Sequence, residues 1–136
     1  MTHSESIEAI EALYSARAQY PITFEKLAQW WRALAEELGS GYTMGVDDLT
    51  NDLTNRDLLE EAIGLLSASD REWLVSLISP GDLRYLEVTL EDPADHLSGF
   101  FRHGDGWWWL RLPRVPGVLV RQPGLADFEA WQETPT

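Results

Sequence analysis

The chain has 136 residues, 44% of them hydrophobic and 24% charged, and its formal net charge is −13. This length and composition are typical of one globular domain over residues 1–136, with frayed ends at 1–4 and 132–136. The absence of cysteine excludes disulfides and thiolate metal sites, and the acidic excess disfavours nucleic acid and anionic membranes as partners.

The first residues of the sequence have neither the basic start nor the apolar run of a secretory signal peptide. No stretch of the chain approaches the roughly 18 consecutive apolar residues that a membrane-spanning helix needs. We therefore expect a cytoplasmic protein.

Two amphipathic helices are expected first along the chain. Apolar residues recur at helical spacing over residues 6–20, and Pro21 ends this helix. A second helix over residues 24–38 has Thr23 as a favourable N-cap and Gly39 as a favourable stop. One face of the second helix is apolar and the other charged, which predicts that it packs on the core.

The next segment, residues 40–55, is polar and rich in turn-forming residues, with one or two helical turns at most. Helical periodicity returns over residues 55–66 and again over 67–79. The pair Pro80-Gly81 is expected to break the last of these helices.

The second half of the sequence changes to the alternating pattern of strands. Asp105-Gly106 is a strong turn signal between two aromatic runs and predicts a tryptophan-rich β-hairpin. Helices first and strands later predict an α+β domain, with about four N-terminal helices packed on one face of a small antiparallel sheet. The expected strands are residues 85–90, 100–103, 107–112 and 118–121, with a closing helical turn at 126–131.

Acidic side chains gather between the second and third expected helices, where Arg56 is the single basic residue. Carboxylates at this density repel one another unless a cation lies near them, so the stretch predicts a docking surface for a basic protein partner. A solvated loop flanked by the polar faces of two helices is the alternative interpretation. The candidate partner-binding residues are Glu36, Glu37, Asp47, Asp48, Asp52, Asp57, Glu60 and Glu61.

A calcium site in this stretch is not supported by its spacing. Asp48, Thr50 and Asp52 match the first, third and fifth positions of an EF-hand loop. Leu53 stands where the loop needs glycine, and Leu59 stands where it needs a bidentate glutamate.

The expected hairpin is the second candidate site. Strand alternation would place Trp107, Trp109 and Arg111 together on one face, as an aromatic patch with a guanidinium. Trp and Arg dominate binding hot spots, so this patch predicts a surface for a protein partner or a ligand. A face covered by other parts of the chain is the alternative, and stacking of single-stranded nucleic acid is opposed by the net charge.

Two histidines lie in the second half, near acidic residues. A mixed nitrogen and oxygen metal site would form only if strand pairing brought His96 and His103 together with Asp92 or Asp95. The spacing does not require this, so we predict no metal and no cofactor.

The sequence carries none of the common catalytic motifs, and whether the protein is an enzyme stays open. Small size, dense acidity and many tryptophans favour a non-enzymatic protein-binding domain. By analogy of size and charge alone, one such class is an inhibitor or immunity-type protein that neutralises a basic partner such as a nuclease toxin. The alternatives are a small-ligand or enzyme domain with a pocket lined by Trp107, Trp109, Arg111 and His103, and a subunit that self-associates, for example as a homodimer.

Overall fold

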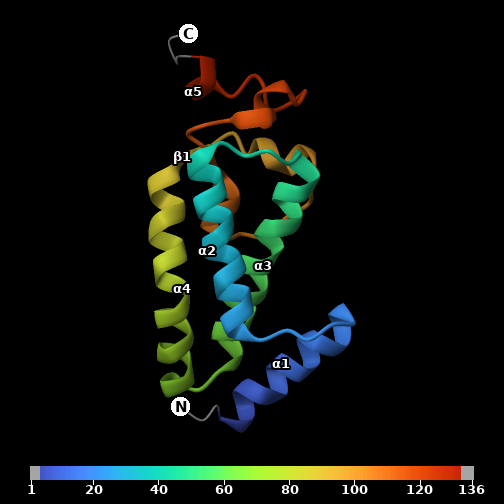
Figure 1. The fold of residues 1–136 in the computed structure, drawn as a ribbon, viewed down its shortest axis with the longest axis vertical. Helices are drawn as coiled ribbons and strands as arrows, with labels where there is room; N and C mark the ends of the chain where they lie inside the picture. Colours follow the sequence, from blue (N-terminus) through green and yellow to red (C-terminus); the bar gives the residue numbers. More distant parts are fainter. Residues whose placement is uncertain (1–3, 133–136) are drawn as a thin grey trace.

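The computed structural model describes residues 4–132, and it has four long helices followed by short elements and a two-stranded antiparallel sheet (Figure 1). The predicted α+β class is therefore confirmed. The predicted fraying falls outside the described residues, except for Ser4 and Gln132. The elements are α1 (Glu5–Ala18), α2 (Phe24–Ser40), α3 (Val46–Leu65), α4 (Ala68–Val88), β1 (Thr89–Glu91), η1 (His96–Gly99), η2 (Trp107–Leu110), β2 (Arg111–Pro113), η3 (Gly117–Arg121) and α5 (Glu129–Gln132).

Helix α2 is the centre of the helical layer, because it packs against both α3 and α4. In Figure 1 these three helices run along the long axis of the molecule, α1 crosses at one end, and the C-terminal segments gather at the other. Thr23 caps α2 as expected, since its hydroxyl accepts a hydrogen bond from the backbone N–H of Lys26. The predicted apolar face is buried: Phe24, Leu27, Ala28, Trp31, Leu34, Ala35 and Leu38.

Helix α3 begins at Val46, so the prediction of a mostly irregular segment at 40–55 was wrong. Val46, Leu49 and Leu53 lie at helical spacing, and all three are buried in the core. This burial outweighs the weak helix propensity of the intervening Asp, Asn and Thr residues.

Helix α4 continues through Pro80 to Val88, so the predicted break at Pro80-Gly81 was also wrong. Proline removes one hydrogen bond from the helix, but Tyr85 and Val88 beyond it are buried and hold the last turns in place. Gly81 is a packing requirement, because a Cβ at this position would lie 2.5 Å from Trp31 Cδ1. The strand expected at 85–90 forms only in part: residues 85–88 belong to α4, and only Thr89 and Leu90 lie in β1.

Strand β1 pairs with β2, with Leu90 opposite Leu112, and this pairing replaces the expected hairpin between residues 100–103 and 107–112. Trp107–Leu110 forms a 3₁₀ turn, as does the expected strand at 118–121. In a strand, successive side chains would point to opposite faces. In the 3₁₀ turn, Trp108 and Trp109 are both buried. Their indole N–H groups donate to the same oxygen, Asp57 Oδ1, at 2.8 and 2.9 Å.

An ion pair of the buried Arg56 with the partly exposed Asp82 connects the helices to the C-terminal half. The guanidinium of Arg56 on α3 donates to both carboxylate oxygens of Asp82 on α4, at 2.9 and 3.1 Å. It also donates to Glu60 at 2.9 Å and lies 4.2 Å from the ring centroid of Trp108. Asp82 accepts a further hydrogen bond from Trp31 of α2. One cation therefore links α3, α4 and η2, and through Asp82 also α2.

Replacing this cation should destabilise the fold. Arg56→Met keeps most of the side-chain volume but leaves Asp82 without its charge partner, and we expect the free energy of unfolding to fall by about 2–3 kcal/mol. Urea unfolding followed by circular dichroism measures this loss.

Arg84→Met is the matched control, since Arg84 pairs with Glu36 and Glu87 at the surface, with 38% of its side chain exposed. Its loss should change stability by less than about 0.5 kcal/mol. Equal effects of the two substitutions would contradict the central role given to Arg56.

Candidate functional site

The eight candidate carboxylates divide into two groups according to their partners. Four are used within the chain. Asp57 accepts the two buried indole N–H groups, so it has a role in the core. The other three face the chain's own arginines: Glu36 with Arg84 at 3.2 Å, Glu60 with Arg56 at 2.9 Å and Glu61 with Arg17 at 3.8 Å.

The remaining four carboxylates, Glu37, Asp47, Asp48 and Asp52, form what we call the acidic cluster. Among residues 4–132, no lysine, arginine or histidine makes an ion pair with any of them. Glu37 lies near the end of α2, and Asp47 and Asp48 lie in the first turn of α3. Of the eight carboxylates predicted to bind a partner, these four are the ones whose charge no cation of the described residues offsets and that do not serve the core.

Tyr42 reports how close three of these carboxylates are. Its ring is buried, and its hydroxyl donates a hydrogen bond of 3.0 Å to Asp52 Oδ2. Burial raises the pKa of Tyr42, and the negative charges of Asp52, Asp48 and Glu37 raise it further. One carboxylate therefore contacts the Tyr42 hydroxyl, and two more lie near enough to act on it electrostatically.

Asp52 is the member of the cluster least exposed to water. Partial burial raises the pKa of its carboxyl, the charges of Glu37 and Asp48 add to this rise, and the hydrogen bond from Tyr42 opposes it. Asp52 is thus held in a place where its charge is disfavoured and where a cation would stabilise it.

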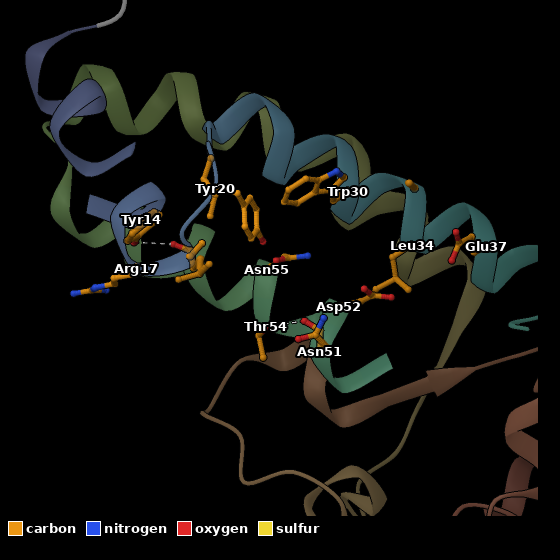
Figure 2. A pocket seen from close by; sticks show the side chains of 14 residues that line it. Tyr14, Arg17, Tyr20, Trp30, Leu34, Glu37, Asn51, Asp52, Thr54 and Asn55 are labelled. Carbon is orange, nitrogen blue, oxygen red and sulfur yellow. Dashed lines mark hydrogen bonds between the residues drawn. The ribbon is translucent and has the colours of Figure 1, made fainter. Parts of the chain in front are cut away.

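A groove of about 550 Å³ lies beside the acidic cluster, between α1, α2 and α3 (Figure 2). Trp30, Leu34 and Glu37 line it from α2, and Asn51, Asp52 and Asn55 line it from α3. Arg17 stands at the α1 end, so the groove runs from a basic end to an acidic one.

Two aromatic rings form part of this groove, and sequence analysis did not single them out. Tyr20 and Trp30 are 52% and 37% exposed, and their ring centroids lie 6.3 Å apart. A signal was present in the sequence: Trp30 lies beside Trp31 but outside the apolar stripe of an amphipathic helix. An indole on the outer face of such a helix is a candidate binding residue.

The expected aromatic patch does not lie on one face. Trp107 is 36% exposed, Trp109 is fully buried, and Arg111 is half-buried. The guanidinium of Arg111 donates to the hydroxyl of Thr89 at 2.7 Å and to the Thr89 carbonyl at 3.0 Å. Trp107 and Arg111 line a cavity of about 360 Å³, without Trp109.

The two histidines have separate partners. His96 Nδ1 lies 2.6 Å from buried Asp92, and His103 Nε2 lies 2.7 Å from Asp95. The His103 ring also stacks on Trp109, with centroids 4.7 Å apart. In the described part of the chain, no three metal-ligating side chains of the His, Cys, Asp and Glu types come together.

Both ring nitrogens of His103 face acceptors, because Nδ1 lies against the carbonyl of Gly104. Burial alone would lower the pKa of His103, but the hydrogen bonds to Asp95 and Gly104 and the charges of Asp95 and Asp57 outweigh it and raise the pKa. These contacts favour the imidazolium form of His103, whose ring stacks on Trp109.

The chain matches no protein-family model, no curated protein and no solved structure. No helix within residues 4–132 has the length and apolar character needed to cross a membrane.

Asp52→Asn should stabilise the free protein at neutral pH. The amide oxygen can still accept the Tyr42 hydrogen bond, while the repulsion from Glu37 and Asp48 is removed. We expect a gain of about 0.5 kcal/mol at pH 7, roughly 2 °C in Tm. Because the pKa of Asp52 is raised in the folded state, the wild type takes up this proton as the pH falls, and the gain should vanish near pH 4.

Asp47→Asn is the control, since Asp47 is exposed in the first turn of α3, where a negative charge is favourable. It should give no gain at either pH. Thermal unfolding at both pH values distinguishes the two, and a loss of stability in Asp52→Asn at pH 7 would show that the Asp52 charge is locally favourable.

His103 should make stability fall as the pH rises. Its pKa is raised in the folded state, so its contribution is complete below the unfolded value of about 6.5 and is lost as the pH rises through the folded value. His103→Phe keeps a ring beside Trp109 and removes the titration. We expect the wild-type Tm to fall by a few degrees more than that of the variant between about pH 6 and 9. Parallel Tm curves would contradict a charged His103.

Proposed function

We propose that this chain is a non-enzymatic binding protein that docks a basic protein partner on the acidic cluster. One observation carries the proposal: four carboxylates of α2 and α3 have no cationic partner among the described residues, and three of them, Glu37, Asp48 and Asp52, act on the same tyrosine. The same chain pairs Glu36, Glu60 and Glu61 with its own arginines. A partner that brings a cation to the cluster would relieve this repulsion on binding.

The charge of the whole molecule supports the same function. A net charge of −13 steers a basic partner toward the surface and raises the rate of association, while it slows the approach of anionic competitors. The cluster also lies on two long helices, so its carboxylates need little ordering when the partner arrives.

Within this function, an inhibitor or immunity-type protein is the class that we propose. Such a protein covers the cationic active site of a partner such as a nuclease, and its carboxylates take the place of substrate phosphates. This finer proposal rests on small size and charge, with no motif behind it.

The other two functions have weaker support. A ligand pocket at the aromatic patch would have only Trp107 and Arg111 of the expected residues, with Arg111 already hydrogen-bonded within the chain.

Self-association would bury exposed apolar side chains such as Leu83 and Leu86 of α4. Light scattering should find a monomer; a dimer that dissociates in Leu83→Glu would favour self-association instead.

Docking can be tested with an oligo-arginine peptide as a surrogate for the basic partner. Asp47→Asn combined with Asp48→Asn should slow association by about threefold to tenfold and flatten its salt dependence, because these charges attract the peptide at long range. Stopped-flow fluorescence between about 50 and 200 mM salt measures both effects.

The matched control is Glu5→Gln combined with Glu8→Gln, which removes the same number of charges from the first turn of α1. It should change the association rate much less. If both double variants slow association equally, the peptide responds to net charge alone and the acidic cluster is no docking surface.

A further inference from the structure

We infer that the groove between α1, α2 and α3 is the anchor site for an arginine side chain carried by an extended segment of the basic partner. This inference rests on the proposed function, and it adds which part of the partner enters the protein and which residues recognise it. It follows from the charge, the aromatic lining and the free polar groups of the groove.

The acidic end of the groove supplies the counter-charge. Glu37 and Asp52 line it from opposite helices, and neither makes an ion pair among the described residues. Asp52 is partly buried, so a cation that reaches it is also partly withdrawn from water, where its attraction to the carboxylate is stronger. Two carboxylates across one groove suit a single cationic side chain.

The aromatic side of the groove favours arginine over lysine. Tyr20 and Trp30 present rings that are not fully packed, and Trp30 lies on the same face of α2 as Glu37. Figure 2 shows these rings on one side of the groove, with Asn55 and Asp52 on the other. A planar guanidinium can stack on an indole and still donate paired hydrogen bonds to a carboxylate, whereas a lysine ammonium gives only a point charge.

The α3 side of the groove supplies groups for a peptide backbone. Asn51 and Asn55 are one helical turn apart, and within residues 4–132 their side-chain amides make no hydrogen bond. An amide offers both a donor and an acceptor, which matches the alternating C=O and N–H groups of an extended chain. The groove continues from Asp52 to α1, where Arg17 lines it, and this length gives an extended segment a path beyond its arginine.

Binding of oligo-arginine and oligo-lysine peptides of equal length tests the inference, because the two probes have the same charge. Wild-type protein should bind the arginine peptide about threefold to tenfold more tightly by calorimetry. Trp30→Leu should abolish this preference while leaving the binding of the lysine peptide nearly unchanged. Asn55→Ala should weaken both peptides, since it removes a contact to the backbone.

Trp107→Leu is the matched control, because Trp107 and Trp30 are exposed to the same extent, 36% and 37%. The control should keep the arginine preference, and circular dichroism should show all three variants folded.

The outcomes separate the inference from the proposed function. Equal affinity of wild-type protein for the two peptides, or a preference that survives Trp30→Leu, overturns the arginine anchor and leaves docking on the acidic cluster standing. Loss of the preference in Trp107→Leu would move the anchor to the aromatic patch and also overturns the inference. A lack of salt-dependent binding to either peptide overturns the proposed function itself.

Discussion

The ion pair between Arg56 and Asp82 is the interaction on which the rest of the structure depends. Removing a guanidinium from water is unfavourable unless every part of it finds a partner, and here two carboxylates and the face of Trp108 provide those partners. Since Asp82 also accepts from Trp31, the packing of α2, α3, α4 and η2 is coupled at one point. The geometry of hydrogen bonds thus supplements apolar packing, which is less specific about orientation.

This interaction explains why carboxylates that are close in sequence have different roles. Glu60 lies one helical turn after Arg56 on α3 and accepts a hydrogen bond from its guanidinium. Asp57 accepts the indole N–H groups of Trp108 and Trp109, so both carboxylates have partners within the fold. Asp52 lies one turn before Arg56 and accepts a hydrogen bond from Tyr42, and it makes no ion pair with an arginine of the described residues. Helix α3 therefore carries the structural carboxylates Asp57 and Glu60 after Arg56, and three members of the acidic cluster, Asp47, Asp48 and Asp52, before it.

Sequence reasoning found what depends on local pattern and missed what depends on tertiary contacts. The apolar stripe and cap of α2 were predictable because both are set by neighbours along the chain. The start of α3 and the continuation of α4 through Pro80 were not, because distant packing overrides weak local propensity. The acidic stretch could be recognised from its composition. Which of its carboxylates have an arginine partner and which have none depends on the positions of the arginines in the folded chain. The two indoles that share Asp57 likewise depend on a contact about fifty residues apart in sequence.

The placement of the acidic cluster follows from the same physics. A carboxylate inside the network around Arg56 has a cationic partner, whereas Asp52 lies outside it, where the charges of Glu37 and Asp48 disfavour its ionised form. Such groups persist at a cost to stability, and crowded, partly buried charge of this kind is typical of functional sites. Here the groove borders that charge, and its walls are α2 and α3, the helices that the Arg56 network fixes. The helices that Arg56 and Asp82 couple therefore present carboxylates without a cationic partner among the described residues, an arrangement that suits a preorganised binding surface.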